Sequence, residues 1–332
     1  MTITAPRGAR LALLAAIATA AVAACSSTTS TASTASTGKI TIAYIPGVSP
    51  FPYFDTAYRG GEAEAKKYGY TLKYVGVSAY DPSTQAAALN AELAARPNFL
   101  LVSPDDNVAL RPAIQRYIDA GIPVITVGGT LNDVQGLVSQ IATDNVEGGR
   151  IVADYLGKSL GGQGTVAVLN LTPGSSTVED RVTGFKQEIQ QKYPQITVLP
   201  EQYGGGTTPG NEQTMRSLLL AHPSINAVFG VAETSAEGAA AAIAAVGKTG
   251  QIKVAAFDAS PEEVKELKSG QIDFLSASEP GVQLALAVDQ VHDYLTGDKS
   301  AIKPATLVPN IGVTTSNVTS PTVIPFLYTA GA

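Results

Sequence analysis

The sequence predicts an α/β protein with two doubly wound lobes, each a parallel sheet covered by helices on both faces. From residue 39 onward, short apolar runs rich in β-branched residues alternate with alanine-rich amphipathic segments of helical length. Near-continuous apolar strands that alternate with helices are typical of parallel sheets buried on both faces. The chain has 332 residues, enough for two domains of ordinary size. We therefore expect two Rossmann-like lobes.

The alternation assigns most of the chain to specific elements. The predicted strands lie at residues 40–45, 72–77, 99–103, 123–127, 165–170, 227–231, 252–257 and 274–277. The predicted helices lie at residues 58–68, 84–95, 108–120, 146–160, 178–193, 210–221, 236–246, 261–268 and 282–295. The pattern does not fix the strand order, but right-handed crossovers are expected. A break between the lobes is expected near residues 142–145, where a long helix begins.

The first 38 residues have the features of an export signal and a tether. Arg7 and Arg10 precede an apolar stretch at 11–24, which is shorter than the roughly 20 residues that span a bilayer but typical of a secretory signal. The run that ends at Cys25 resembles the lipobox of bacterial lipoproteins; the alternative is a small buried cysteine in an ordinary signal peptide. Residues 26–38 are small and polar, as in a flexible tether. We expect a protein exported and anchored by lipid on Cys25 to the outer face of the cell membrane.

Composition excludes several classes of protein. Cys25 is the only cysteine, so no intrachain disulfide forms. The net charge is −6, and the chain has no basic cluster and no tryptophan, which argues against nucleic acid as a partner.

The residues needed for common enzyme chemistry are missing. The only histidines are His222 and His292, both expected to be surface or capping residues, so neither a metal cluster nor a catalytic triad is recognisable. The glycine-rich stretches 161–170 and 204–210 lack the context or the lysine of a phosphate-binding loop. The pair Asp105-Asp106 could serve acid–base chemistry, but before a helix it is expected to act as a cap. We predict that the protein is not an enzyme and binds no cofactor.

Ligands of open parallel sheets collect at the carboxyl ends of the strands. The loops that follow the predicted strands would line one cleft if the two lobes face each other.

Several blocks of sequence resemble the periplasmic sugar-binding proteins of the ribose and galactose type, the substrate-binding subunits of ABC importers. The blocks appear in the family's order from about residue 39 to about 312: "PYFDTAYRGGEAEAKKYGYTL", "VSPDDNVALRPAIQRYIDAGIPVITVG", "ATDNVEGGRIVADYL", "AVFGVAETSAEGAAAAI" and "VAAFDASPEE". The resemblance implies a clamshell of two lobes that close on a ligand around a hinge of three crossings, near residues 142–144, 277–280 and 308–311. It also implies delivery of the ligand to a membrane permease.

The resemblance also implies domain boundaries. Residues 1–24 are expected to form the signal peptide and residues 25–38 the lipidated tether. The N-terminal lobe is expected at 39–143 plus 279–309, and the C-terminal lobe at 144–278 plus 310–332. A monomer is expected, because the family's lobes must open and close freely.

The resemblance places candidate ligand contacts in both lobes. In the family, aromatic rings in the first loop stack on the faces of the sugar, a strand-end aspartate accepts hydrogen bonds from sugar hydroxyls, and an arginine enters the cleft from a helix. In this sequence the corresponding contacts are Phe51, Tyr53, Phe54, Ser103, Arg181, Tyr203, Glu233, Asp258, Ser278 and Glu279. The open alternatives are a core-facing stripe for the aromatic residues, a surface ion pair for Arg181, and a helix cap for Asp258, although Ser260 is the better cap.

The sequence departs from the family at polar positions. Gly128 and Gly129 stand where ribose-type binders carry an acid–arginine pair, and Ala232 and Phe51 stand where they carry asparagines. A buried polar group left unpaired costs about 1–3 kcal/mol, so a ligand other than ribose or galactose in the usual pose is expected. A short polyol, a deoxy sugar, a larger glycoside above the glycines, and a less polar cyclic compound stay open. So does a non-sugar ligand such as an aromatic or sugar acid. The calcium loop of galactose binders is not recognisable, and we predict no metal.

Two other functions stay open. A sensor that closes on its ligand and signals to a membrane receptor would use the same clamshell. An exported enzyme on this fold would need a base or nucleophile in the cleft, and none is apparent.

Overall fold

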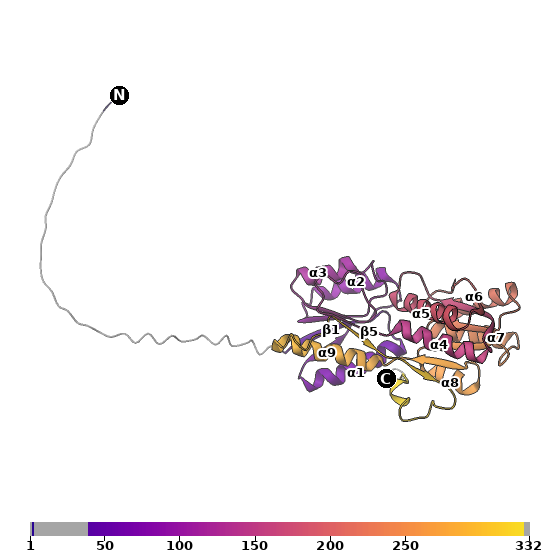
Figure 1. Cartoon of the computed structure of the whole chain (residues 1–332). Helices are drawn as coiled ribbons and strands as arrows, with labels where there is room; N and C mark the ends of the chain where they lie inside the picture. Colours follow the sequence, from indigo (N-terminus) through magenta and orange to yellow (C-terminus); the bar gives the residue numbers. More distant parts are fainter. Residues whose placement is uncertain (1, 3–38, 329–332) are drawn as a thin grey trace. The chain divides into compact units, whose positions relative to one another are not determined.

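The computed structural model describes Thr2 and residues 39–328. Residues 39–328 form two lobes, each a sheet between layers of helices (Figure 1). Within the described residues, no helix is both long and apolar enough to cross a membrane. The predicted signal peptide, Cys25 and the tether lie outside the described residues.

The first lobe contains a six-stranded parallel sheet in the order β12-β5-β4-β3-β1-β2. Its strands are β1 (Thr41–Ile45), β2 (Thr71–Tyr74), β3 (Phe99–Val102), β4 (Val124–Gly128), β5 (Ser139–Thr143) and β12 (Ala305–Val308). Helices α1 (Pro52–Lys67) and α9 (Pro280–Thr296) cover one face, and α2 (Pro82–Leu93) and α3 (Arg111–Asp119) cover the other. Along β1, Ile42 and Tyr44 belong to one core layer and Ala43 and Ile45 to the other, as a sheet buried on both faces requires.

The second lobe contains a seven-stranded sheet whose main path is β13-β11-β10-β9-β6-β7, with β8 paired to β6. Its strands are β6 (Gln163–Asn170), β7 (Gln195–Val198), β8 (Gln202–Tyr203), β9 (Ala227–Gly230), β10 (Lys253–Phe257), β11 (Phe274–Ala277) and the antiparallel β13 (Ile311–Val313). Helices α4 (Asn145–Ser159) and α5 (Ser176–Lys192) pack on one face. Helices α6 (Thr208–Ala221), α7 (Glu233–Ala245) and α8 (Pro261–Ser269) pack on the other.

Two glycines let helices α4 and α5 approach each other closely. A Cβ atom on Gly149 of α4 would overlap the carbonyl oxygen of Arg181, and one on Gly184 of α5 would overlap that of Val146. Only glycine allows backbones to come this near. The contact places the first turns of α5 directly beside the start of α4.

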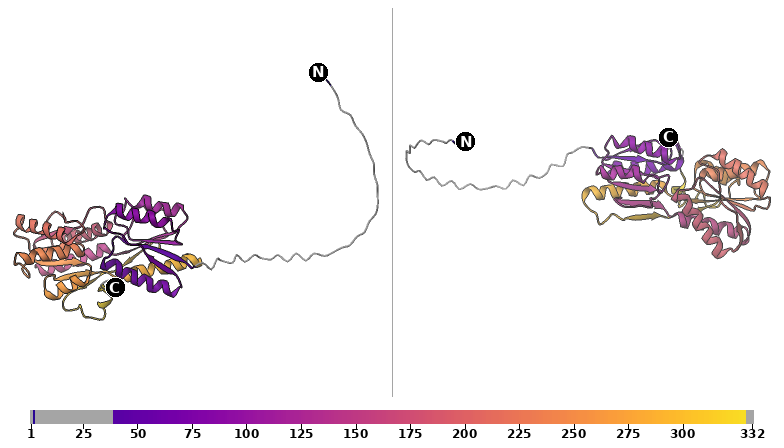
Figure 2. Two further views of the ribbon diagram at one scale, coloured as in Figure 1. Left: turned by 180° about the vertical axis from the view of Figure 1, so that it is seen from behind. Right: turned by 90° about the horizontal axis from the view of Figure 1, so that it is seen from above.

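The chain crosses between the two sheets three times, as the resemblance implies. The crossings join β5 to α4, β11 to α9 and β12 to β13, and the two lobes lie side by side in Figure 2. Two crossings are tied together, because the Asp144 amide donates to the carbonyl of Val308 at 2.8 Å and the Asn310 side chain donates to the carbonyl of Asp144 at 2.7 Å.

The structure differs from the sequence prediction at element boundaries. Helix α1 begins at Pro52, six residues before the predicted start, because proline is favoured in the first turn of a helix. Tyr53 and Phe54 therefore lie in a helix and not in the expected open loop. Strands β5, β7, β8, β12 and β13 were not predicted. A short 3-10 helix at Ile324–Phe326 leads the chain to Tyr328.

Candidate functional site

A cavity of about 400 Å³ opens between the carboxyl ends of the two sheets. Both lobes line it: the first contributes Phe51, Tyr53, Phe54, Tyr80, Ser103 and Asp105, and the second Thr177, Arg181, Thr207, Thr234 and Asp258. This volume suits a small ligand.

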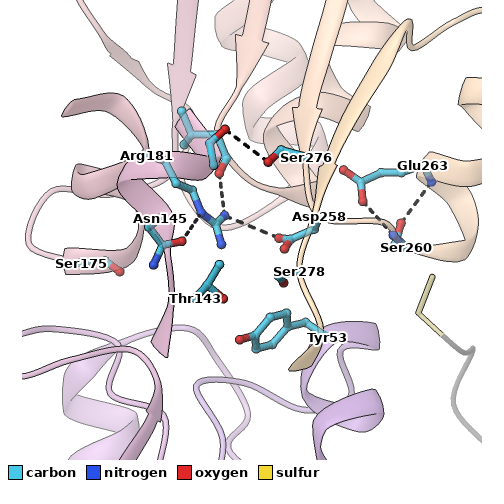
Figure 3. A network of polar contacts seen from close by, with 12 residues as sticks. Tyr53, Thr143, Asn145, Ser175, Arg181, Asp258, Ser260, Glu263, Ser276 and Ser278 are labelled. Atoms are coloured by element: carbon cyan, nitrogen blue, oxygen red, sulfur yellow. Dashed lines mark hydrogen bonds and ion pairs between the residues drawn. The ribbon is translucent and has the colours of Figure 1, made fainter. Parts of the chain in front are cut away.

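Arg181 is the polar centre of the second-lobe wall, and its side chain is 4% exposed. Its Nε donates to Oδ1 of Asn145 at 3.0 Å and its Nη1 donates to the carbonyl of Val231 at 2.7 Å. Nη1 also lies 3.6 Å from Oδ2 of Asp258, and the guanidinium carbon lies 3.5 Å above the centre of the Phe257 ring. Figure 3 shows the side chain between Asn145 and Asp258. The alternative of a surface ion pair with Glu179 or Asp180 is thus wrong.

Asp258 follows strand β10 and is held from two sides. Its Oδ2 faces Arg181, and its Oδ1 accepts a hydrogen bond from the Tyr328 hydroxyl at 2.8 Å. Its backbone φ of 92° is rare for a residue with a side chain, and such strain is characteristic of functional sites. The helix-cap alternative is excluded, because Ser260 forms a capping box with Glu263 at the start of α8.

The cavity floor on the first-lobe side is organised by Tyr53. Its hydroxyl donates to Oε1 of Gln283 at 3.1 Å, and the Gln283 amide donates to the hydroxyl of Thr143 at 2.8 Å, beside a lobe crossing. Burial raises the pKa of Tyr53 to about 12, so its hydroxyl keeps its proton. A Cβ on Gly128 would lie 2.9 Å from the Tyr53 hydroxyl, and one on Gly129 would lie 2.8 Å from the Pro104 carbonyl oxygen. A side chain at either position would therefore meet the protein's own wall, while the glycines themselves line the cavity.

The other aromatic candidates also lie in the first-lobe wall. Phe54 is 8% exposed and packs against both Phe51, at 5.9 Å between ring centres, and Tyr53, at 5.1 Å. These rings line the cavity and belong to the core of the lobe at the same time. Ser103 is nearly buried at the end of β3, where its hydroxyl pairs with that of Tyr44 at 3.1 Å.

Four of the sequence-predicted residues do not line the cavity. Tyr203 is 47% exposed on β8, with its hydroxyl directed at Glu201. Glu233 is buried in the first turn of α7, Ser278 pairs with Tyr328 at a lobe crossing, and Glu279 precedes α9. The structure brings the other six, Phe51, Tyr53, Phe54, Ser103, Arg181 and Asp258, to one cavity.

The structure adds residues that the sequence did not identify. Asp105 and Asp106 were expected to cap a helix, but neither does so, because α3 begins at Arg111 after Leu110 without a side-chain cap. Asp106 accepts from the amides of Val108 and Ala109 in the preceding turn. Asp105 lies in the cavity wall instead. Tyr328 comes from a C-terminal segment without recognisable pattern, so no sequence signal pointed to its contact with Asp258.

The two lobes touch across the cavity mouth. Thr130 of the first lobe donates its hydroxyl to that of Ser176 in α5 at 3.0 Å, and the hydroxyls of Tyr80 and Ser175 lie 3.1 Å apart. The Asn107 amide donates to the carbonyl of Gly174 at 3.2 Å. These contacts describe a closed clamshell.

Within residues 39–328 no group of three or more histidine, cysteine, aspartate or glutamate side chains is arranged to hold a metal ion.

Comparisons with known proteins agree with this architecture. The pattern of the periplasmic binding protein domain matches residues 42–299. The ribose import binding protein of Salmonella typhimurium is 32% identical over 80% of this chain and 88% of its own length. Among solved structures, an ABC transporter solute-binding protein from Agrobacterium vitis bound with alpha-D-tagatopyranose is 34% identical, with a TM-score of 0.85 over 88% of this chain and 100% of that chain. A carbohydrate transporter solute-binding protein from Agrobacterium radiobacter, in complex with D-arabinose, is 26% identical, with a TM-score of 0.83 over 88% of this chain and 100% of that chain. The chain therefore belongs to the periplasmic binding protein family.

Proposed function

We propose that this protein is the solute-binding component of an ABC importer and captures a small carbohydrate or polyol between its lobes. The observation that carries the proposal is the cavity itself, which both lobes line and which combines aromatic rings with the buried pair Arg181–Asp258. Aromatic rings suit the apolar faces of a sugar, and a fixed fork of donors beside a carboxylate suits its hydroxyls. The relatives named above for ribose, tagatopyranose and D-arabinose support this ligand class.

We infer that the proposed domains, 39–143 plus 279–309 and 144–278 plus 310–332, open and close around the three crossings. A ligand that contacts both lobes binds the closed state better and shifts the population toward it. The contacts of Thr130 with Ser176 and of Tyr80 with Ser175 would exist only in that state. A membrane permease would then recognise the closed, loaded protein.

The proposed ligand contacts are the six sequence-predicted residues that line the cavity: Phe51, Tyr53, Phe54, Ser103, Arg181 and Asp258. Tyr203, Glu233, Ser278 and Glu279 are left out of this set because they lie outside the lining. The two glycines at 128 and 129 remove an acid–arginine pair from the first-lobe wall, and Tyr53 and Pro104 occupy the adjoining space. The ligand therefore meets a more apolar first-lobe wall than the resemblance implies.

The proposed location is the outer face of the cell membrane, with lipid on Cys25 as the anchor. The support is the sequence around Cys25 and the polar tether at 26–38. A protein held in this way would keep its cavity close to the permease that it serves.

A thermal-shift screen of the purified protein against monosaccharides, polyols and sugar acids tests the ligand class. A ligand at a hundred times its dissociation constant adds about 2.7 kcal/mol of stability. Phe51→Ala should reduce the shift, because its ring lines the cavity. The matched control is Tyr203→Ala, which removes an exposed aromatic ring outside the cavity. A shift with aromatic acids and with no sugar or polyol would overturn the carbohydrate assignment and leave the fold untouched.

A further inference from the structure

Asp105 is a buried carboxyl group without a partner in the cavity wall. The residue is 3% exposed, and neither Oδ1 nor Oδ2 forms a hydrogen bond with any described residue. Its position is fixed from behind, because its amide donates to Oε1 of Gln85 at 2.9 Å. The Gln85 side chain in turn donates to the carbonyls of Pro46 and Ser103. Asp105 is therefore held in the cavity wall, where both of its carboxyl oxygens are covered and unpaired in this closed state.

Neither protonation state of this carboxyl is satisfied by the protein. An ionised carboxylate without a partner is costly to bury, and a protonated one would leave its O–H donor unpaired. Burial raises the pKa of Asp105 to about 9, and the nearby Asp81 and Asp106 raise it further. The backbone amide of Asp81 lowers the pKa of Asp105, but by less than burial raises it. This amide forms its own hydrogen bond with the carbonyl of Ala79. A group in this state is a candidate for ligand binding.

The cavity offers no cation to Asp105. Among the residues that line it, the charged ones are Asp105, Arg181 and Asp258. Arg181 is committed to Asp258, Asn145 and the carbonyl of Val231, all in the second lobe. The first-lobe wall thus presents one carboxyl and no positive group, and Gly129 stands where the resemblance implies an arginine.

The surroundings of the carboxyl are aromatic. A Cβ atom on Gly47 would overlap Oδ1 of Asp105 and lie 2.8 Å from Cζ of Phe54 and 3.0 Å from Cε2 of Tyr80, so all three groups converge on one point. Phe51 packs against Phe54 and also lines the cavity. Aromatic rings beside a carboxylate attract an organic cation through the negative faces of the rings.

We propose that the ligand carries a protonated amino group and that Asp105 binds it, so that the cargo is an amino sugar or an amino polyol. This inference rests on the proposed function and narrows its ligand class. The ammonium group would donate to Oδ1 and Oδ2 beside Phe51, Phe54 and Tyr80. The hydroxyls of the same ligand would face Arg181 and Asp258 in the second lobe. One positive charge would then balance the one unmatched carboxylate.

The test is calorimetric titration with matched pairs of ligands at about pH 6.5, where an amine is mostly protonated. Each amino-monosaccharide is compared with the parent that has a hydroxyl at the same carbon and with its uncharged N-acetyl derivative. We expect at least one amino sugar to bind tenfold or more tightly than its parent, and N-acetylation to abolish the advantage. If every parent binds as tightly as its amino sugar, the inference is overturned and the carbohydrate function stands. If no amino sugar, parent sugar or N-acetyl derivative binds, both the inference and the proposed carbohydrate function are overturned.

Asp105→Asn keeps the shape of the side chain and removes its charge. We expect this variant to lose tenfold or more in affinity for the amino sugar and less than threefold for the parent. The matched control is Asp106→Asn, which alters the neighbouring carboxylate that accepts from loop amides and does not line the cavity. Without ligand, Asp105→Asn should melt at a higher temperature than the wild type, because it removes a buried carboxyl group that has no partner. This melting transition also checks that the variant folds. Equal losses of affinity for both ligands would show that Asp105 does not recognise the charge of the ligand, and would overturn the proposal.

Discussion

Nη1 of Arg181 lies 3.6 Å from Oδ2 of Asp258, and the two side chains are 4% and 6% exposed. The distance is long for a direct hydrogen bond, so the pair is held by its neighbours more than by itself. Asn145 and Val231 fix the guanidinium, and Tyr328 fixes the carboxylate. The two charged groups are thus fixed in the cavity wall by neighbouring residues.

Replacement of Arg181 should destabilise the protein strongly. Arg181→Met removes the charge that faces Asp258 and leaves a buried carboxylate with Tyr328 as its remaining partner, which costs about 3–5 kcal/mol in comparable buried pairs. Urea unfolding without ligand measures this loss. The matched control is Arg150→Met on α4, because the Arg150 side chain is 42% exposed and lies 3.7 Å from Glu147. Its effect should stay within about 1 kcal/mol, and equal losses in the two variants would contradict the buried-pair interpretation.

The hydroxyl of Tyr328 should contribute to stability through Asp258. Tyr328→Phe keeps the ring against Tyr53, at 5.7 Å between centres, and removes both the donor to Oδ1 of Asp258 and the hydroxyl contact with Ser278. A hydrogen bond to a charged group contributes about 1.5–3 kcal/mol, so the free energy of unfolding should fall by that amount. Tyr203→Phe serves as the control, because its hydroxyl lies on the surface beside Glu201. Equal free energies of unfolding for the two variants would show that the Tyr328 hydroxyl does not stabilise Asp258.

The contact between Thr130 and Ser176 should stabilise the closed state selectively. Ser176→Ala removes a hydrogen bond that joins the two lobes, worth about 0.5–1.5 kcal/mol. In the proposed mechanism ligand binding depends on closure, so the affinity should fall by about two- to tenfold. Calorimetric titration measures this change, and small-angle scattering of the loaded protein should show a larger open fraction. Ser217→Ala, an exposed helical serine whose hydroxyl bonds within its own helix, should leave both unchanged; an equal effect there would exclude a role in closure.

The regular part of the fold could be predicted from the sequence because apolar periodicity records burial directly. Strands β1, β3 and β4 are buried on both faces, and their short apolar runs of aliphatic and aromatic residues identify them. Strand β12 at the sheet edge alternates exposed residues with one partly buried and one buried residue over four positions, which is too short to distinguish from a loop. Strand β5 carries polar residues at Ser139 and Gln140, so its pattern was missed although it lies inside the sheet.

The candidate site was predicted less completely, because it depends on contacts between distant segments. Arg181 and Asp258 could be found because the family resemblance assigns a role to each position, one at the start of a helix and one at the end of a strand. Tyr328 reaches Asp258 across 70 positions, and no local pattern encodes that contact. Asp105 and Asp106 are identical in type, and only the fold directs one into the cavity and the other to loop amides.

Replacement of Cys25 tests the proposed anchor. Cys25→Ser should prevent lipid attachment and release the protein from the membrane, because the serine hydroxyl cannot replace the thiol as the site of thioether formation. Fractionation and mass spectrometry of the protein from its own cells measure this. Ser26→Ala, next in the sequence, should leave the protein membrane-bound. Retention of Cys25→Ser in the membrane fraction would contradict the lipoprotein assignment.

The buried carboxyl group of Glu233 in the second lobe should make the free energy of unfolding depend on pH. Glu233 is 7% exposed, its Oε2 has no partner among the described residues, and burial raises its pKa to about 9, with Glu237 and Asp258 adding to the rise. The folded protein therefore retains a proton that the unfolded chain releases above about pH 4.3, so stability falls as the pH rises from about 4.5 to 9. Glu233→Gln stays neutral, and at pH 8.5 it should exceed the wild type by at least about 1 kcal/mol. Urea unfolding at pH 5 and 8.5 measures this, with the partly exposed, ion-paired Glu212→Gln as the control; parallel pH profiles for the wild type and Glu233→Gln would contradict the prediction.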